Sequence, residues 1–471
     1  MYSIGRKKMK TKNLTKFYVF SIVCAFLSIT TFAQVTKKEK AEGWEPLFNG
    51  KNFDGWKQLN GEAKYSVENG VIVGKTVHGT PNSFMTTEKT YGDFVLELEL
   101  MVDNSMNSGV QFRSLSKTDY NNGRVHGYQM EVDPSNRAWS GGIYDEARRG
   151  WLYPLNLNPT GQKAFKKDDW NKYRIEAVGN TLRTFINGVP CAHLIDDMTS
   201  EGFICLQVHG ISKDATEGTE VKWKNIKIQT GKNIKMMPWD DTYVANQIKN
   251  DLSAQEKEQG FELLFDGNSF EKWRGYGQPN MTSRRWNAVD GEIHVGKSDG
   301  SETGNDIITK ETFGPFEFKF DFKLTEGANS GVKYFVDEKF NSGGKSGIGL
   351  EFQILDDEKH PDAKMGVVGN RTIASLYDLI PSIKADKRFL RKIGEWNQGR
   401  VVVMPDNTVQ HWLNDFKVVE YNRGDNIYKA LVARSKYKDF DGFGLSETGH
   451  LLLQDHGDEV HFKSLKVRKL K

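Results

Sequence analysis

An internal repeat constrains the fold of this chain more than any other feature of its sequence. Residues 43–56 read GWEPLFNGKNFDGW, and residues 260–273 read GFELLFDGNSFEKW. Further pairs of similar segments follow in the same order, with spacings that vary because of loop insertions: 67–74 with 289–296, 90–100 with 312–322, 107–110 with 329–332, 170–171 with 396–397, 185–189 with 412–416, 202–210 with 449–457 and 221–228 with 460–467. Colinear matches of this kind indicate a duplicated domain.

Each copy carries the sequence signals of a β-sandwich. Apolar and polar residues alternate along 95–100 and 316–322, which is the period of a strand with one buried face. Each copy begins with a capping box for a short helical turn, TKKE at 36–39 and SAQE at 253–256. Short strands joined by glycine turns, in about 200 residues per copy, are typical of a two-sheet sandwich. We therefore predict an all-β protein with two tandem sandwiches.

The repeat also predicts the domain boundaries. The first copy occupies 36–230 and the second occupies 259–471. The linker, 231–258, is expected to contain a helical stretch around Asp241 to Glu258. Residues 1–33 have the pattern of an export signal, because a basic segment precedes an apolar stretch and a small-x-small cleavage site. A membrane anchor is the alternative, but the apolar stretch is short for a spanning helix, which needs roughly 20 residues. After removal of the signal, no segment is expected to span a membrane.

Charge and cysteine content narrow the functional classes. The net charge is +3, and no basic block occurs outside the first 17 residues and the last few, so nucleic acid is not an expected partner. Cys191 and Cys205 follow the predicted signal, and they allow either a disulfide or two buried thiols. The second copy has no cysteine, so a disulfide cannot be essential to the fold. The sequence indicates no particular oligomeric state.

Several short motifs recur in the two copies. In the first copy they are LFNG at 47–50, NSGV at 107–110, IYD at 143–145 and QVHG at 207–210. In the second copy they are LFDG at 264–267, NSGV at 329–332, EFQILD at 351–356, SLYD at 375–378 and QDHG at 454–457. These motifs resemble the 3-keto-disaccharide hydrolase domain family over nearly all of the chain that follows the predicted signal.

The resemblance implies a fold, a location and an activity. The implied fold is a concanavalin A-like β-jelly roll in each copy. The implied location is the periplasm or the extracellular space of a Gram-negative bacterium. The implied activity is cleavage of 3-keto-glycosides, by hydrolysis or by elimination, with a carbohydrate substrate as the partner.

Strand alternation sorts polar side chains onto one face of the predicted sheets. Glu351 and Gln353 share a face, and Gln129 and Glu131 do the same in the first copy, where the acid and the amide are exchanged. The same rule pairs Gln454 with His456, Gln207 with His209, Gln111 with Arg113 and Lys333 with Phe335. If the sheet face were simply exposed to solvent, that would explain the polar residues of a single strand. Because three motifs keep the pattern in both copies, we favour a carbohydrate cleft.

The implied reaction assigns roles to these residues. A ketone at C3 of the sugar acidifies the hydrogen on C2, so that a base can remove it and the enolate can expel the glycosidic oxygen from C1. His456 or His209 is a candidate base or acid, and Glu351 or Glu131 is the second. Lys333, Arg113 or a metal could hold the enolate. Tyr377 and Tyr144 could donate a proton or stack on the sugar ring. The candidate sugar-binding residues are Gln353, Gln454, Asn329, Gln129, Glu131, Arg113, Tyr144, Gln207 and His209.

A divalent metal such as calcium is a weaker expectation, and no cofactor is firmly predicted. The segment LDDEKHPDA offers oxygen-rich ligands, namely Asp356, Asp357, His360 and Asp362. A solvated acidic loop explains these residues more simply.

Three functional classes remain open at this point. The first is an enzyme that cleaves 3-keto-glycosides. The second is a non-catalytic carbohydrate-binding protein, or a chain with one catalytic and one binding copy, since sandwiches of this class also serve as lectins. The third, a scaffold without a ligand, is disfavoured because Gln-x-His-Gly occurs in both copies.

Overall fold

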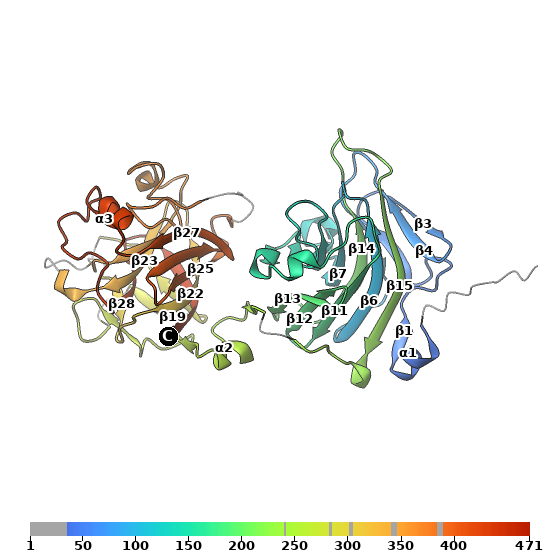
Figure 1. The fold of residues 1–471 in the computed structure, drawn as a ribbon, viewed down its shortest axis with the longest axis horizontal. Helices are drawn as coiled ribbons and strands as arrows, with labels where there is room; N and C mark the ends of the chain where they lie inside the picture. The colour runs from blue at the N-terminus through green and yellow to red at the C-terminus, as the bar shows by residue number, and fades with distance from the viewer. Residues whose placement is uncertain (1–34, 240–241, 282–284, 301–304, 341–345, 384–389) are drawn as a thin grey trace, which may run out of the picture. The chain divides into compact units, whose positions relative to one another are not determined.

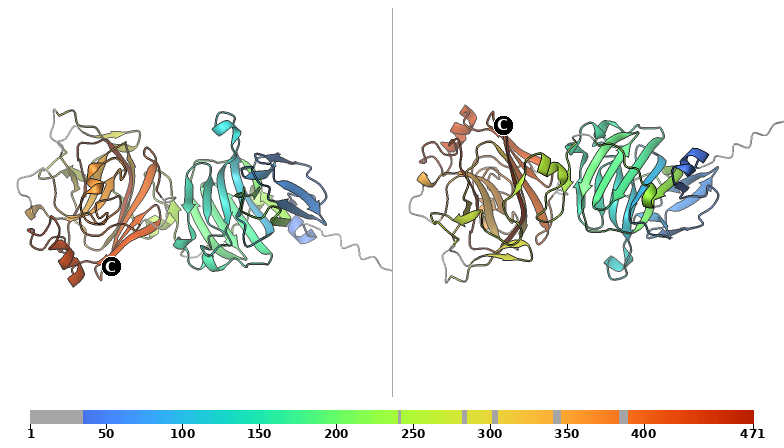
Figure 2. Two further views of the ribbon diagram at one scale, coloured as in Figure 1. Left: turned by 90° about the horizontal axis from the view of Figure 1, so that it is seen from above. Right: turned by 90° about the horizontal axis from the view of Figure 1, so that it is seen from below.

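The computed structural model describes residues 35–239, 242–281, 285–300, 305–340, 346–383 and 390–471. Within these residues, each copy of the repeat forms its own pair of mainly antiparallel sheets (Figure 1). Two further views of the same sheets are given in Figure 2. The predicted export signal, 1–33, lies outside the described residues. Among the described residues, no helix is long and apolar enough to cross a membrane.

The first copy is a sandwich of a larger and a smaller sheet. The larger sheet contains β1 (Trp44–Pro46), β3 (Lys64–Glu68), β4 (Val71–Lys75), β6 (Phe94–Val102), β11 (Asn171–Val178), β12 (Thr181–Ile186), β13 (Val189–Ile195), β15 (Glu220–Thr230) and β16 (Ala245–Asn246). The smaller sheet contains β2 (Trp56–Leu59), β5 (Ser83–Thr87), β7 (Ser108–Leu115), β8 (His126–Val132), β9 (Ile143–Glu146), β10 (Gly150–Tyr153) and β14 (Phe203–Val208).

The second copy repeats this architecture. Its larger sheet contains β17 (Glu262–Leu263), β19 (Trp286–Val289), β20 (Glu292–Val295), β22 (Phe316–Leu324), β25 (Trp396–Val403), β26 (Thr408–Leu413), β27 (Phe416–Asn422) and β29 (Val460–Lys469). Its smaller sheet contains β18 (Trp273–Gly275), β21 (Ile307–Thr309), β23 (Asn329–Val336), β24 (Leu350–Leu355) and β28 (His450–Leu453). The helix α3 (Asn426–Val432) lies between β27 and β28. The predicted all-β fold is therefore confirmed.

The space between the two sheets of each copy is filled by the apolar faces that strand alternation predicts. In the second copy, Phe318 and Phe320 of β22 pack with Phe352 of β24 in one buried cluster. Burying a phenylalanine side chain contributes about 1.5–3 kcal/mol, so these alternating faces dominate the stability of each sandwich. Cys191 and Cys205 are both buried and free, which decides against the disulfide.

The capping boxes form as predicted, but the linker is less helical than predicted. Helix α1 (Lys37–Ala41) is capped by Thr36, and α2 (Ala254–Glu258) is capped by Ser253, each with the reciprocal glutamate. In the described part of the linker, α2 is the one α-helix. The expectation of a longer helix is wrong because β16 pairs in parallel with β13 and holds that stretch extended.

A β-bulge in β7 and in β23 changes the direction of two predicted site residues. Arg113 and Phe335 have φ values of 47° and 51°, and the strand register shifts there in both copies. The extra residue turns the side chain away from the face that simple alternation assigns to it. The prediction that Gln111 and Arg113 point together, and that Lys333 and Phe335 do so, is therefore wrong.

The bulge gives Arg113 a different set of partners from the predicted sugar. Its guanidinium donates to the carbonyl oxygens of Gly92 and Gly179, at 2.9 and 2.8 Å, and to the Asp93 carboxylate at 3.1 Å. These bonds connect two loops, and because Arg113 is only 1% exposed, a ligand cannot reach its guanidinium.

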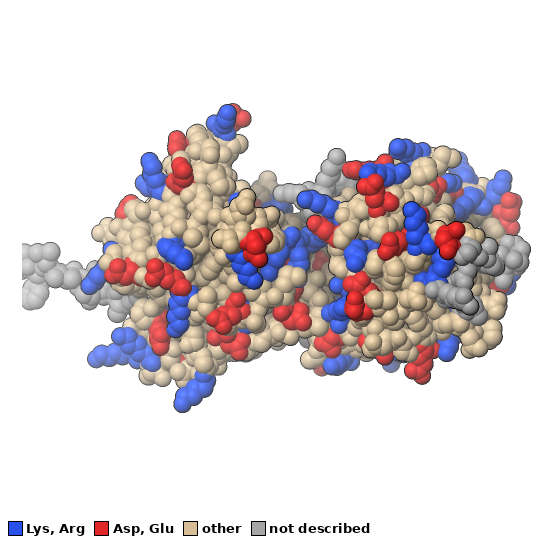
Figure 3. Space-filling model, turned by 180° about the vertical axis from the view of Figure 1, so that it is seen from behind, with Lys and Arg blue, Asp and Glu red and all other residues tan. Residues whose placement is uncertain are grey.

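Charged side chains are interspersed over the surface. Figure 3 shows lysine and arginine intermingled with aspartate and glutamate on the face in view. This distribution agrees with the small net charge of +3.

Candidate functional site

In the second copy, a buried carboxylate lies beside two lysines on the outer face of the smaller sheet. Glu351 of β24 is directly opposite Lys333 of β23 in the strand register, and the two side chains are 4% and 5% exposed. Burial raises the pKa of Glu351, while the charges of Lys333 and Lys436 oppose that rise. Burial also lowers the pKa of Lys436, and the nearby Glu351 carboxylate opposes this change. Glu351 is thus a buried carboxyl group whose pKa reflects both desolvation and two nearby positive charges.

The Lys333 ammonium is held in one place by its acceptors. Its Nζ donates to Ser346 Oγ at 3.2 Å and to the Gly347 carbonyl at 3.0 Å, and lies 4.0 Å from Asp306 Oδ2. Burial raises the pKa of Asp306, while the Lys333 charge opposes that rise. The positive charge therefore has a fixed position next to Glu351.

Tyr377 is joined to Glu351 through the backbone and to Asp362 through its hydroxyl. Its N–H donates to the Glu351 carbonyl at 3.0 Å, and its hydroxyl donates to Asp362 Oδ2 at 2.7 Å. Lys436 Nζ lies 4.1 Å from the centre of the Tyr377 ring. Burial and the Asp362 carboxylate raise the pKa of Tyr377, so the phenol stays protonated. Arg371 orients Asp362 with a bond of 2.9 Å.

His456 and Gln454 lie in the loop that follows β28, which ends at Leu453. The prediction that they share a strand face is wrong. The Asp455 N–H donates to Asp306 at 2.9 Å and its carboxylate pairs with Arg285 at 2.8 Å, so the chain turns after Leu453. His456 is exposed, and its charge is among those that oppose the rise in the pKa of Glu351.

Two predicted amides of the second copy, Gln353 and Asn329, lie on the same face as Glu351. Gln353 donates to Asn329 Oδ1 at 3.4 Å. Gln353 Oε1 is buried and accepts no hydrogen bond from the described residues. This free acceptor is suited to a sugar hydroxyl.

The first copy contains a pocket at the corresponding place. The predicted residues that line it are Asn107, Gln129, Glu131, Tyr144, Gln207 and His209, and they are joined there by Asn82, Asp133, Arg137, Glu146 and Trp151. Burial raises the pKa of the Glu131 carboxyl to about 7, against the effect of hydrogen bonds from Asn107 and Gln129. Gln207 is fully buried, and neither atom of its amide has a hydrogen-bond partner among the described residues.

In each copy, the Asn-Ser-Gly motif contacts both the last motif and a polar side chain of the candidate site. Ser108 and Ser330 each donate to a backbone carbonyl of the last motif, that of Gln207 at 2.7 Å and that of Gln454 at 2.8 Å. The glycine leaves room for a crossing side chain. A Cβ at Gly331 would collide with Glu351 Oε1, and a Cβ at Gly109 would collide with the Gln129 side chain.

This close approach gives a prediction for Gly331→Ala. The colliding atom is the far end of a flexible side chain, so the fold is expected to tolerate the methyl group while the Glu351 carboxylate moves. We expect a normal thermal midpoint and a loss of activity of at least tenfold, since a misplacement of about 1 Å can cost on the order of 100-fold. Gly109→Ala is the matched control in the first copy. Equal activity in the two variants would contradict this interpretation of the motif.

The acidic loop that was a weak metal candidate has local partners instead. Asp356 accepts backbone N–H groups from Gly327, Glu358 and Lys359. Asp357 accepts the Ile373 N–H at 2.7 Å. With Asp362 bonded to Tyr377 and Arg371, and His360 accepting from the Asp362 N–H, these side chains cap turns of their own loop. They are not among the described residues whose ligand atoms converge as a metal requires.

Lys436 is the functional candidate that the sequence reasoning missed. It lies after α3, in the segment between β27 and β28 that is much longer than its counterpart between β13 and β14. The insertion is visible in the sequence as an increase in the spacing between corresponding segments of the two copies. The position of Lys436 is not, because strand alternation does not predict the direction of a side chain in a loop.

Comparison with known proteins shows which family contains this chain. The chain is 35% identical over 234 residues to a 3-keto-disaccharide hydrolase of Bacteroides thetaiotaomicron, which covers 45% of this chain and 79% of that relative. It is also similar to two crystal structures of candidate glycosyl hydrolases from Parabacteroides distasonis. The first is 29% identical in sequence, with a TM-score of 0.42, and the matched region covers 48% of this chain and 100% of the chain in that crystal structure. The second is 24% identical in sequence, with a TM-score of 0.33, and the matched region covers 45% of this chain and 99% of the chain in that crystal structure.

The family model described as the 3-keto-alpha-glucoside-1,2-lyase-like domain matches residues 43–229 and 260–468, one match for each sandwich. These matches together span well over half of the sequence, and so the chain belongs to the 3-keto-alpha-glucoside-1,2-lyase-like domain family, with two copies in tandem.

Proposed function

We propose that this chain cleaves the glycosidic bond of 3-keto-glycosides and that its second copy is the catalytic one. The observation that carries the proposal is the buried Glu351 carboxylate, which lies opposite Lys333 in the strand register and within the influence of the Lys436 charge, and whose pKa burial raises. Family membership and the name of the Bacteroides relative support the substrate class.

The proposed reaction begins with loss of the proton on C2. Glu351 takes this proton, and the electron pair of the C2–H bond forms the enolate whose negative charge develops on the C3 oxygen. Lys333 and Lys436 stabilise that charge in a site from which water is largely excluded. A group with a pKa raised toward the working pH can both accept and return a proton, which suits Glu351 to this role.

The enolate then expels the oxygen on C1. The C1–O bond breaks, a C1=C2 double bond forms, and His456, at the exposed edge of the site, gives the leaving oxygen its proton. Release at this stage makes the enzyme a lyase. Addition of water, with the oxygen to C1 and a hydrogen to C2, makes it a hydrolase. Neither branch requires an oxidant or a reductant.

The first copy is proposed to bind carbohydrate. The specific observation is Gln207, a fully buried amide on the pocket wall with no protein partner for either atom among the described residues. An amide that is buried without partners is costly, and sugar hydroxyls would satisfy both its donor and its acceptor. Glu131 lies among amides, and its Oε1 is 3.9 Å from the Arg137 guanidinium.

The function is tested by comparing a 3-keto-glucoside with its parent glucoside, using the mature chain and identifying products by mass and NMR. Only the ketone-bearing substrate should be cleaved, because the parent glucoside has no acidic C2 hydrogen. Cleavage of both would indicate an ordinary glycosidase. Binding without any cleavage would indicate a lectin, and a parallel reaction with a chelator tests for a metal requirement.

Export to the periplasm or beyond is the second part of the proposal. It is supported by the basic start, the apolar stretch and the small-x-small triplet that ends at Ala33. We expect N-terminal sequencing of the native protein to begin at Gln34. A mature protein that retains Met1 or Met9 would refute cleavage at this site.

A further inference from the structure

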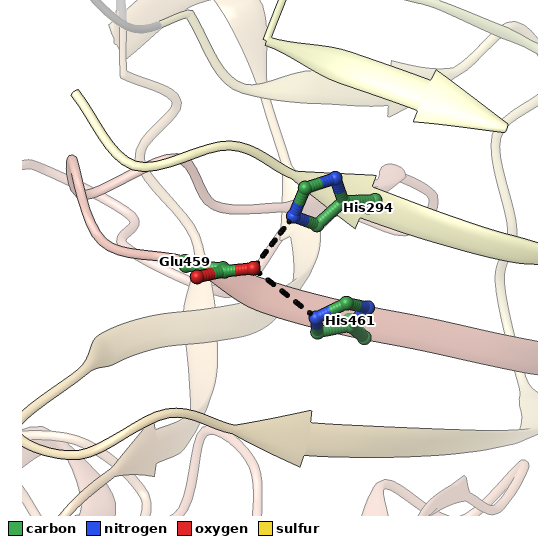
Figure 4. A group of neighbouring side chains, drawn as sticks. All are labelled: His294, Glu459 and His461. Carbon is green, nitrogen blue, oxygen red and sulfur yellow. Dashed lines mark hydrogen bonds and ion pairs between the residues drawn. The ribbon is translucent and has the colours of Figure 1, made fainter. Parts of the chain in front are cut away.

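Two histidines and a glutamate meet on the second copy, on the sheet that does not carry Glu351. His294 of β20 and His461 of β29 are direct partners in the strand register, and Glu459 immediately precedes β29 (Figure 4). Their neighbours Ile293, Val295, Val460 and Phe462 belong to the core. Alternation therefore places both imidazoles on the outer face of the larger sheet, with the core between them and the candidate active site.

The three side chains converge with the geometry of metal ligands. Glu459 Oε1 lies 2.9 Å from His294 Nε2 and 3.6 Å from His461 Nε2 (Figure 4). One ligand atom from each residue lies within 4.8 Å of the others. Zinc binds imidazole nitrogen and carboxylate oxygen at about 2.0–2.2 Å, which places tetrahedral ligand atoms about 3–3.5 Å apart. Small side-chain movements would bring this group to that spacing.

A second carboxylate orients one of the imidazoles. His461 Nδ1 lies 3.1 Å from Glu292 Oε2. In the tautomer that donates the Nδ1 proton to Glu292, Nε2 carries a lone pair on the side of Glu459 that can bind an ion. Histidines that ligate metals commonly have such a carboxylate partner, which fixes the tautomer and raises the basicity of the ligand. The nearby lysines have other contacts: Lys323 pairs with Glu292 at 3.4 Å, and Lys463 lies over the Trp396 ring.

The first copy shows that the fold does not require this arrangement. At the same register position it pairs Val73 with Lys222, and Glu220 lies two residues before Lys222, as Glu459 lies two residues before His461. Glu220 there makes ion pairs of 2.8 Å with Lys222 and with Lys75. In the first copy a valine and a lysine occupy the positions of the two histidines, and the two strands still pair. The two histidines are therefore a specific property of the second copy.

We propose that His294, Glu459 and His461 bind a divalent transition metal ion of the zinc class. Two imidazoles and one carboxylate favour zinc or its neighbours over calcium and magnesium, which prefer oxygen ligands. The side chains are 30%, 39% and 18% exposed, which leaves room for water to complete the coordination. The ion would clamp β20 to β29, and this role is independent of the proposed reaction.

The test uses the untagged mature chain after chelator treatment, titrated with Zn²⁺ by calorimetry and with Co²⁺ by visible absorption. We expect one saturable ion per chain, the absorption of Co²⁺ bound by nitrogen and oxygen, and a higher thermal midpoint with Zn²⁺. His461→Lys installs the residue of the first copy, and Glu459→Gln changes only charge and protonation. Each should weaken binding at least tenfold and abolish the thermal shift.

His360→Ala is the matched control, since it removes a histidine from the same copy at a distant loop, and it should bind like the wild type. Circular dichroism and the metal-free midpoint show whether each variant folds. If His461→Lys is unstable, Glu459→Gln still decides the question. The proposal is overturned if no stoichiometric binding occurs, or if binding persists unchanged in both variants.

Discussion

Replacing Glu351 with glutamine is expected to lower the rate of 3-keto-glucoside cleavage by about 100- to 10,000-fold, the usual loss when a general base is removed. The amide cannot accept the C2 proton. The substitution should be structurally mild, because the first copy already carries a glutamine, Gln129, whose side chain crosses the glycine of its Asn-Ser-Gly motif in the same way.

The matched control is Glu131→Gln, which removes the carboxylate of the first copy. If that copy only binds sugar, this variant should keep a near-normal rate at saturating substrate. Initial rates are to be measured for both variants, with circular dichroism to verify folding. If Glu131→Gln is the inactive variant, the roles of the two copies are reversed. Near-normal activity in both would exclude either carboxylate as the essential base.

Replacing Lys436 with glutamine is expected to lower the maximal rate by about 100- to 1,000-fold, the loss typical of removing one group that stabilises a developing oxyanion. The effect should fall on the rate constant more than on substrate binding, because the negative charge exists only after the C2 proton has left. Lys339→Gln is a suitable control, since Lys339 also lies over an aromatic ring but is exposed and pairs with Asp337.

The pH profile separates this role of Lys436 from a purely structural one. The Lys436 charge opposes the rise in the pKa of Glu351, so its removal should raise that pKa further. Glu351 acts as a base only above its pKa, and the acidic limb of the activity profile should therefore move to higher pH in Lys436→Gln. An unchanged limb, even with a reduced rate, would show that the Lys436 charge does not act on the base.

The repeat and the strand period were sufficient to predict the sandwiches and one face of the site. The strand period can be recognised within a few residues of sequence. In β24, for example, Leu350, Phe352 and Ile354 are buried between the two sheets, which fixes the core face of that strand. Glu351 and Gln353 must then share the opposite face, as predicted. The same reasoning correctly grouped Gln129 with Glu131 in the first copy.

Alternation failed where the backbone leaves the regular strand. Because of the bulge at Arg113, a residue that was predicted to bind sugar instead holds two loops together. Because the chain turns at Asp455, Gln454 and His456 do not belong to β28. Lys436 was missed because a long insertion brings it over Tyr377, and no period in the sequence encodes that contact. The histidine pair on β20 and β29 was missed because its members are distant in sequence and become neighbours only through strand pairing.

The exchange of glutamate and glutamine between the copies has a structural consequence that the sequence alone did not reveal. In the first copy, the Asn107 amide donates to Glu131 at 2.6 Å. In the second, the corresponding Asn329 accepts from Gln353 instead. The asparagine serves either arrangement because an amide is both a donor and an acceptor. The exchange therefore moves the carboxylate from a setting of amides and one arginine to one with two lysines.

The central claim is that cleavage passes through an enolate at C2, and the most direct measurement is the fate of the C2 hydrogen. The reaction is run in D₂O with the mature chain, and the sugar product is analysed at once by NMR and mass. The Glu351→Gln variant, incubated with the product sugar, controls for spontaneous exchange beside the ketone. We expect a product with deuterium at C2, if water is added, or with a C1=C2 double bond, if it is not. A product that keeps its original C2 hydrogen in full would indicate direct displacement at C1 and would contradict the account.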